Sequence, residues 1–121
     1  MKTVKITSNN KISVVEVDFN NFRSIQNAIG GRFETVHTKT MKEYFKDAGI
    51  VLLVDEEFLL KGLPVNRLGC WFYNTFDHGA PICGDFILGK VNGEDIIGPK
   101  DAEEIKKQLI KDFAYLKEEI A

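Results

Sequence analysis

The clearest periodic pattern in the chain lies near its C-terminus. From Pro99 to Ile120, Lys and Glu separate six apolar residues that recur every three or four positions: Ala102, Ile105, Leu109, Phe113, Leu116 and Ile120. This spacing predicts a long amphipathic helix with one face packed on the rest of the protein. We expect Pro99 in its first turn, where the acidic residues Asp101, Glu103 and Glu104 complement the helix dipole.

Apolar and alternating segments predict the first strands. Ile50 to Val54 is continuously apolar, which is typical of a strand covered on both faces and places it in the interior of a sheet. Lys11 to Asp18 is β-branched and roughly alternating, as in a half-buried strand. Thr3 to Thr7 offers it a partner across Ser8-Asn9-Asn10, so we expect the chain to open with a hairpin.

Two further strands are predicted downstream. Arg32 to His37 alternates between polar and apolar residues. Pro81 to Val91 also has strand character, and its glycines Gly84 and Gly89 indicate a bulge or a close approach of other backbone. Asn92-Gly93 directly after it is a strong turn signal.

Short helices are expected between these strands. Asn20 or Asn21 can cap a helix that Gly30-Gly31 ends, and its apolar residues are Phe22, Ile25, Ala28 and Ile29. Lys39 to Asp47 also fits a short helix, because its apolar and aromatic residues have helical spacing; a loop with aromatic anchors is the alternative.

Together these elements predict an α+β fold. We expect a small mixed, mostly antiparallel sheet with a short N-terminal helix and a long C-terminal helix packed on it. The 121 residues fit a single compact domain, 1–121, and no repeat or linker divides them. With 44% apolar and 28% charged residues, the chain has the composition of a globular protein and not of a disordered one.

Charge and cysteine usage narrow the range of partners. A formal charge of −2 gives no electrostatic support to a nucleic-acid partner. The first residues lack the apolar core of a signal peptide and no segment is long enough to span a membrane, so we expect a cytoplasmic protein without membrane contact. Cys70 and Cys83 are expected as free thiols. Because neither lies three or four residues from His37 or His78, no metal site and no cofactor is predicted.

The segment Gly62-Leu63-Pro64-Val65-Asn66-Arg67 holds the first candidate site residues. The guanidinium of Arg67 can clamp a phosphate or carboxylate through two parallel hydrogen bonds, while the carboxamide of Asn66 reads a base or amide edge. In the alternative reading, Asn66 caps a helical turn and Arg67 forms a structural ion pair with Glu56 or Glu57.

An aromatic run follows, and it completes the candidate set. If Trp71, Phe72 and Tyr73 form a strand, Trp71 and Tyr73 share one face, which can stack on a nucleobase or form a protein interface. Ordinary core filling is the alternative. The predicted ligand-binding residues are Asn66, Arg67, Trp71, Tyr73 and His78.

No pattern of residues predicts an enzyme. The glycines at Gly30-Gly31 and Gly89-Lys90 lack the context of a nucleotide fingerprint or a P-loop, and no Gly-x-Ser-x-Gly elbow occurs. Catalysis would require His78, Asp77 or Asp85 to converge with one of the cysteines.

Four segments carry a resemblance to a known family: Ile25 to Gly31, Ile50 to Asp55, Gly62 to Arg67 and Gly84 to Gly89. The resemblance covers roughly residues 12 to 115. The family is the domain of unknown function family 3846, small proteins of phages and mobile elements, whose function is uncharacterised. The Gly-Leu-Pro-x-Asn-Arg segment is the most specific part, and Leu68 to Ala80 departs from the family pattern.

The resemblance implies a phage setting, and with it a type of function. By analogy with other small phage accessory proteins, we expect a non-catalytic binding protein that sequesters a small anionic, nucleotide-like host defence signal. The alternative is a protein-interaction module that inhibits a host protein by direct contact. An aromatic-rich surface and an edge strand also favour self-association, so a homo-oligomer is a further expectation.

Overall fold

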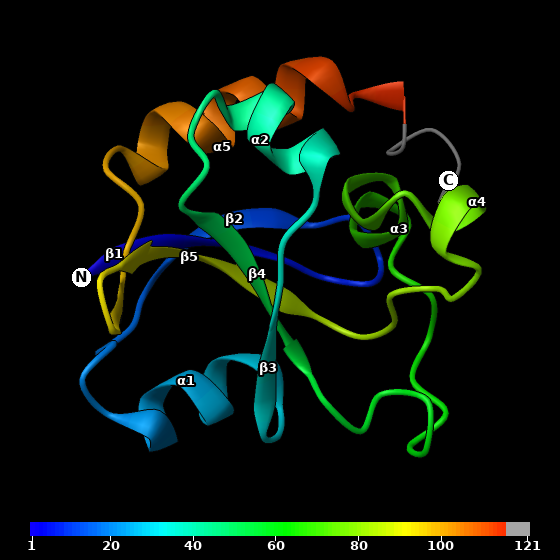
Figure 1. The fold of residues 1–121 in the computed structure, drawn as a ribbon, viewed down its shortest axis with the longest axis horizontal. Helices are drawn as coiled ribbons and strands as arrows, with labels where there is room; N and C mark the ends of the chain where they lie inside the picture. Colours follow the sequence, from blue (N-terminus) through cyan, green and yellow to red (C-terminus); the bar gives the residue numbers. More distant parts are fainter. Residues whose placement is uncertain (116–121) are drawn as a thin grey trace.

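The computed structural model describes residues 1–115, and for Phe76 and Asp77 the backbone alone. Figure 1 shows strands and helices interleaved along the chain. The strands are β1 (Lys2–Ile6), β2 (Ile12–Glu16), β3 (Phe33–Val36), β4 (Ile50–Asp55), β5 (Phe86–Asn92) and β6 (Asp95–Ile97). The helices are α1 (Phe22–Ile29), α2 (Lys39–Phe45), α3 (Arg67–Tyr73), α4 (Thr75–His78) and α5 (Ala102–Asp112).

The strands of residues 1–115 form one six-stranded sheet. Its order is β2-β1-β5-β4-β3, and β6 pairs with the C-terminal part of β5. Every pair of neighbouring strands is antiparallel. The predicted α+β class is therefore confirmed, as are the opening hairpin, formed by β1 and β2, and the turn after β5.

The central strand β4 explains the uninterrupted apolar run of the sequence. Ile50, Leu52 and Val54 belong to the larger core cluster, whereas Val51 and Leu53 belong to the smaller one. Because successive side chains of a strand point to opposite faces, β4 contributes to both cores and every one of its residues is buried. The prediction of a doubly covered strand is confirmed.

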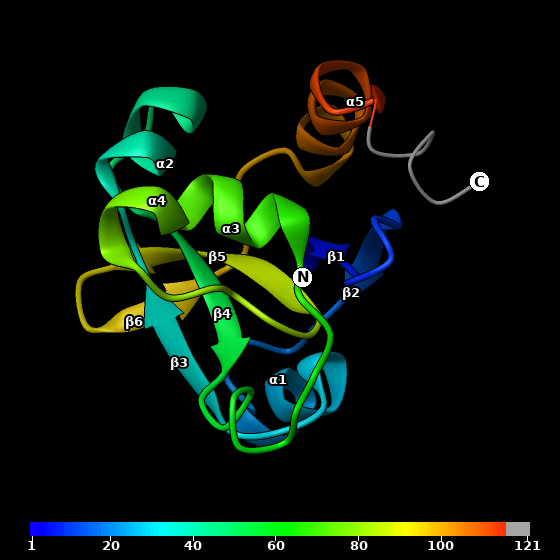
Figure 2. The ribbon, with the colours of Figure 1, turned by 90° about the vertical axis from the view of Figure 1, so that its right-hand side faces the viewer.

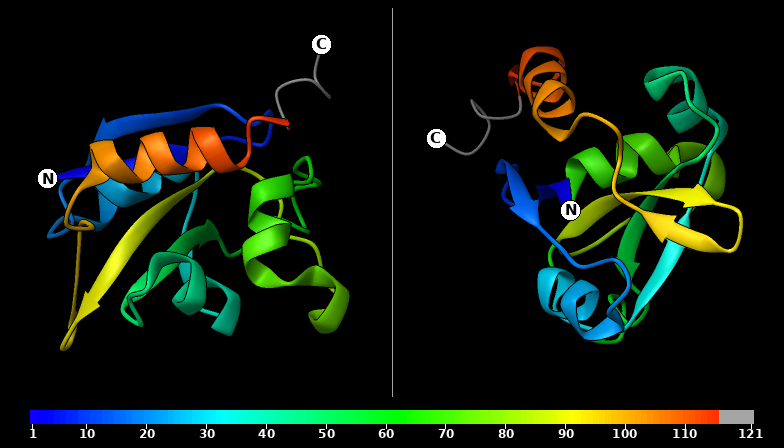
Figure 3. Two further views of the ribbon diagram at one scale, coloured as in Figure 1. Left: turned by 90° about the horizontal axis from the view of Figure 1, so that it is seen from above. Right: turned by 90° about the vertical axis from the view of Figure 1, so that its left-hand side faces the viewer.

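The helices divide unequally between the two faces of the sheet. Figures 1 and 2 show α2, α3 and α5 on one face and α1 on the other. Seen from above in Figure 3, α5 runs over β1 and β2, which it contacts, and α2 contacts β4 and α3. No helix within residues 1–115 is long and apolar enough to cross a membrane.

The C-terminal helix begins later than its sequence predicts. The side chain of Asp101 accepts a hydrogen bond from the backbone N–H of Glu104 at 3.2 Å, so Asp101 caps α5 and Pro99 lies before the helix. The predicted apolar stripe faces the core at Ala102, Leu109 and Phe113. Its last members, Leu116 and Ile120, lie outside the described residues.

The first helix matches the prediction at both ends but not along its whole apolar face. Asn21 caps α1, and Gly30 ends it with a left-handed φ of 94°. Ile25 and Ile29 are buried, as expected for the core face. Phe22 is 70% exposed, so the first residue of the stripe does not join the core.

The strand predicted from Pro81 begins only at Phe86. Gly84 has a φ of 82°, and its N–H donates a hydrogen bond of 2.7 Å to the carbonyl of Pro64. A residue in the left-handed region cannot continue a regular strand. The segment before β5 therefore pairs with the loop before α3 instead of extending the sheet.

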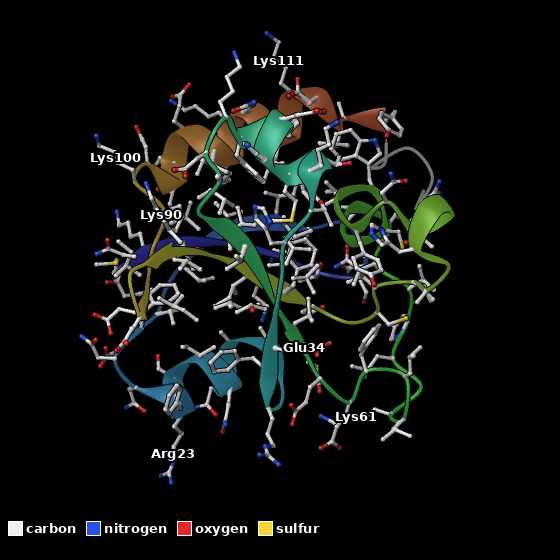
Figure 4. All side chains as sticks on the ribbon, in the orientation of Figure 1. Arg23, Glu34, Lys61, Lys90, Lys100 and Lys111 are labelled. Atoms are coloured by element: carbon white, nitrogen blue, oxygen red, sulfur yellow. The ribbon has the colours of Figure 1, made fainter. Side chains whose placement is uncertain are left out.

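A buried carboxylate at the end of β4 forms an ion pair with the loop that leads to α3. Asp55 is 1% exposed, and Nζ of Lys61 lies 2.6 Å from its Oδ2 (Lys61 is labelled in Figure 4). The other oxygen of Asp55 accepts from the N–H of Glu57 at 2.9 Å. A Cβ on Gly31 would lie 2.7 Å from Oδ2 of Asp55, so a side chain at this position would displace the pair.

Removal of the ammonium should destabilise the fold through Asp55. We expect Lys61→Met to lower the free energy of unfolding by about 2 kcal/mol, because a buried charge loses its partner. The double variant Asp55→Asn, Lys61→Met should recover part of that loss. Urea unfolding followed by circular dichroism measures both. Lys11→Met, at an exposed position, is the matched control, and an equal effect of Lys61→Met and Lys11→Met would contradict the interpretation.

A second carboxylate stabilises the turn between α2 and β4. Oδ2 of Asp47 lies 2.9 Å from Nζ of Lys90, and its Oδ1 accepts from the N–H of Gly49 at 2.8 Å. The hydrogen bond from Lys90, followed by that from Gly49, lowers the pKa of Asp47 below its ordinary value of 3.8.

This shift predicts a pH dependence of stability. Because the pKa of Asp47 is lower in the folded state, its stabilisation is complete above the ordinary value of 3.8 and is lost as the pH falls through the lower, folded value. Asp47→Asn should therefore cost about 0.5 to 1 kcal/mol at neutral pH, and the difference from the unmodified protein should shrink below about pH 4. Unfolding curves across this range provide the measurement. A difference that stays constant down to about pH 2 would refute the assignment.

Candidate ligand-binding cleft between α3 and α5

Asn66 is the residue that positions α3. Its side chain is fully buried, and Oδ1 accepts a hydrogen bond from the N–H of Gly69 at 2.9 Å, which caps the helix. Its Nδ2 donates to the carbonyl of Ile6 in β1 at 3.2 Å and to that of Gly84 at 2.9 Å. The predicted alternative of a helix cap is confirmed. Because its carboxamide is buried, Asn66 is not accessible to a ligand. Its role is to hold the start of the helix on which Arg67 lies.

The rest of the Gly-Leu-Pro-x-Asn-Arg segment packs against the segment before β5. Gly62 has a φ of 65°, which favours glycine, and the N–H of Asn66 donates to the carbonyl of Ile82 at 2.8 Å. A Cβ on Gly69 would lie 2.6 Å from Cγ2 of Ile82, so the first turn of α3 lies directly against the segment before β5.

The aromatic run is helical, and the expectation of a strand is wrong. Trp71, Phe72 and Tyr73 are the last three residues of α3. The cap at Asn66 begins a helix whose residues Leu68 and Phe72, four positions apart, are both fully buried. Trp71 and Tyr73 therefore do not share a face, in contrast to the alternation that a strand would impose.

An open cleft lies beside α3. Arg67, Cys70 and Trp71 are three and four residues apart, so they occupy one side of the helix and line a cleft of about 640 Å³. Figures 2 and 3 show α3 next to α2 and the C-terminal end of α5, which supply the other walls. The remaining lining residues come from these and adjoining segments: Thr40, Val65, Asn74, Thr75, Phe113 and Tyr115.

Ring contacts fix the aromatic side of the cleft. Trp71 is 44% exposed, and its ring meets Phe113 edge to face with centroids 5.0 Å apart and Tyr44 with centroids 5.6 Å apart. The hydroxyl of Tyr44 donates to Oδ2 of Asp112 at 2.7 Å, which joins α2 to α5. Burial, and then this hydrogen bond, raises the pKa of Tyr44, so the phenol stays protonated and keeps donating.

Tyr73 and His78 form a separate pair. Their rings stack with centroids 4.7 Å apart, and Nδ1 of His78 lies 2.6 Å from the carbonyl oxygen of Tyr73. His78 lines a different hollow, together with His37. Of the five predicted site residues, the structure thus places Arg67 and Trp71 in the cleft, Asn66 beneath it, and Tyr73 with His78 outside it.

Several lining residues had no signal in the sequence. Phe113 fits the apolar stripe of α5 and is in fact 5% exposed, so nothing distinguished it from an ordinary core residue. Thr40 and Tyr115 are far apart in the chain and meet at the cleft only through the packing of α2 and α5 around α3. Cys70 could be placed beside Arg67 only once the segment was known to be helical.

Cys70, Cys83 and Asp85, three of the groups considered for catalysis, all have a structural setting. The Sγ of Cys70 accepts from the N–H of Ile82 at 3.4 Å, and burial, followed by the nearby Cys70, raises the pKa of Cys83. Asp85 lies directly before β5, two residues after Cys83, and its Oδ2 is 3.8 Å from Nζ of Lys5. Among the side chains that the structure describes, there is no group of three or more His, Cys, Asp or Glu that could hold a metal ion.

The support given by Asn66 can be measured. We expect Asn66→Ala to lower the free energy of unfolding by about 2 to 4 kcal/mol, because the cap is lost and two buried carbonyls lose their donor. Asn66→Asp keeps an acceptor for the N–H of Gly69 but places an oxygen against the carbonyls of Ile6 and Gly84. At neutral pH it should therefore lower the free energy of unfolding at least as much as Asn66→Ala does. Asn21→Ala, which removes only an exposed cap, should cost about 1 kcal/mol. Urea unfolding compares the three, and an Asn66→Asp variant as stable as the unmodified protein would refute the role of the amide.

Comparison with known proteins agrees with the resemblance seen in the motifs. Residues 1–110 match the family described as "Domain of unknown function (DUF3846)". No curated protein and no solved structure matches the chain. Since the match covers most of the 121 residues, the chain belongs to the DUF3846 family.

Proposed function

We propose that this protein is a non-catalytic binding protein that holds a small anionic, nucleotide-like ligand in the cleft between α3 and α5. The observation that carries the proposal is the position of Arg67 and Trp71. They lie four residues apart on α3, on the same side of the helix, and both line the cleft. A guanidinium and a partly exposed indole in one cleft offer the two contacts that a flat, anionic molecule requires.

The remaining walls fit the same class of ligand. A volume of about 640 Å³ lies within the usual range for small-molecule sites, about 300 to 1,000 Å³. Tyr115 is 52% exposed and Val65 is also exposed, so the walls have apolar surface for a base. Thr40, Asn74 and Thr75 bring polar groups that can read the edge of a heterocycle.

The proposed biological role follows from the setting of the family. Small phage accessory proteins can act by sequestering a host signal, and a binding cleft without assembled catalytic groups suits that role. We therefore propose that the ligand is a nucleotide-like signal of a host defence system and that the protein acts by reducing its free concentration.

The single tryptophan allows a direct test. We expect nucleoside monophosphates and cyclic dinucleotides to change the fluorescence of Trp71 on titration, while uncharged adenosine binds at least about tenfold more weakly. Arg67→Lys should weaken binding about tenfold, roughly 1.4 kcal/mol, because an ammonium cannot reproduce the planar fork. Trp71→Leu, measured by calorimetry, should lose a similar amount, since stacking on a base contributes about 1 to 3 kcal/mol.

Arg23→Lys is the matched control, because Arg23 does not line the cleft and extends into solvent on the α1 side of the molecule in Figure 4. It should leave affinity unchanged. Native mass spectrometry of the purified protein adds an independent readout: a co-purifying mass of a few hundred daltons, absent from Arg67→Ala, supports the proposal, and the same spectrum gives the oligomeric state. Equal nucleotide affinity of Arg67→Lys and the unmodified protein would exclude the cleft as the binding site.

One observation favours a second candidate function, the inhibition of a host protein by direct contact. Leu60 is 89% exposed and Leu59 61% exposed, in the loop that leads to Gly62 and α3. Large apolar side chains presented to solvent are typical of protein interfaces. A clean mass spectrum without ligand, together with no nucleotide binding, would favour this candidate.

A further inference from the structure

The face of the sheet opposite the cleft carries a second, smaller hollow. It has a volume of about 210 Å³ and lies between the start of α1, β3 and the hairpin of β5 and β6. We call it the phenylalanine pocket. Three aromatic and two acidic residues line it together with Asn20, Ile25 and Ile96: Phe19, Phe22, Phe33, Glu94 and Asp95.

Phe22 is the feature of this pocket that the fold does not explain. Phe19, Phe33 and Ile96 pack against the smaller core cluster and so contribute to stability. Phe22 is 70% exposed, and its ring lies beside that of Phe33 with centroids 5.9 Å apart and planes tilted by 39°. An exposed phenylalanine gains little from folding, whereas its ring face is available to a ligand.

The charge beside these rings is negative. Glu94 and Asp95 are both exposed, at the turn and start of β6, and within residues 1–115 neither forms an ion pair. Lys90, the basic residue nearest to Glu94 in the sequence, pairs with Asp47. Arg23, next to Phe22, lines a neighbouring hollow and extends away from the body of the protein in Figure 4. Aromatic faces attract cations through their quadrupole, and two carboxylates add to that attraction.

The geometry points to a basic side chain of a partner polypeptide as the occupant. We propose that the phenylalanine pocket binds one lysine or arginine side chain, with its cation over the rings of Phe22 and Phe33 and next to Glu94 and Asp95. The pocket is smaller than the sites of drug-sized molecules, about 300 Å³ and above, and so fits one side chain better than a whole metabolite.

The surroundings favour a polypeptide over a free amine. An adjoining hollow shares Phe19 and Ile96 with the pocket and continues along Asp18 and Ile97. The residues of the partner on one side of its bound lysine or arginine can therefore lie in this adjoining hollow, next to the carboxylate of Asp18. A free amine would use only the pocket itself.

This proposal does not depend on the proposed function. The pocket lies on the face covered by α1, and the cleft lies on the face covered by α2, α3 and α5 (Figure 1). Variants of one site leave the residues of the other untouched, so each proposal can fail without the other.

Nuclear magnetic resonance provides the test. Amide spectra of the labelled full chain are titrated with a blocked pentapeptide that has one lysine among alanines, and with the same peptide carrying the uncharged, nearly isosteric norleucine. We expect the lysine peptide to bind at millimolar concentration and to shift the signals of Phe19, Phe22, Phe33 and the turn at Glu94. The norleucine peptide should bind at least about threefold more weakly, because a neutral chain loses the attraction to ring faces.

Two variants separate the contributions of the rings and of the charges. Phe22→Leu keeps an apolar side chain without a ring face, and the double variant Glu94→Gln, Asp95→Asn removes the charge; each should weaken the lysine peptide about threefold. Glu103→Gln, at an exposed position of α5, is the matched control and should change nothing. Equal binding of the two peptides, unchanged affinity in both variants, or shifts confined to other residues would overturn the proposal. Nα-acetyl-lysine methylamide binding as tightly as the pentapeptide would overturn the assignment to a polypeptide.

Discussion

The position of α3 depends on one buried amide, the side chain of Asn66. A buried carboxamide must find partners for its donors and its acceptor, because an unpaired polar group in the interior costs free energy comparable to a lost hydrogen bond. Asn66 meets this requirement with Ile6 of β1, Gly84 before β5 and Gly69 of α3. Asn66 therefore holds three segments that are far apart in the chain. These bonds also fix the position of Arg67, the next residue and the first of α3.

A second set of contacts ties the helices of the same face together. Thr38 caps α2 and donates to the carbonyl of Phe72 in α3 at 2.5 Å. Tyr44 joins α2 to α5 through Asp112, and its ring contacts both Trp71 and Phe113. The walls of the cleft thus belong to helices already bonded to one another. A cleft formed in this way is largely preorganised, so its side chains lose less conformational entropy when a molecule binds.

The antiparallel sheet separates two hollows that are lined by different charged residues. Its central strands supply side chains to both faces, so each face has its own core and its own helices. The cleft on the larger face has Arg67 at its edge, whereas the phenylalanine pocket on the smaller face has Glu94 and Asp95. The formal charge of −2 for the whole chain does not indicate where these charged residues lie.

The sequence by itself determined the elements whose signals are local. The apolar run of β4, the opening hairpin, the glycine that ends α1 at Gly30 and the periodicity of α5 each depend on neighbouring residues, and each was confirmed over the described residues. Only the tertiary structure decided the rest. Three consecutive aromatics carry no periodicity of their own, so the cap at Asn66 and the core beneath Phe72 made them helical. Tyr115 joins Arg67 in the cleft because α5 packs beside α3, a contact between residues far apart in the chain that no local pattern can encode.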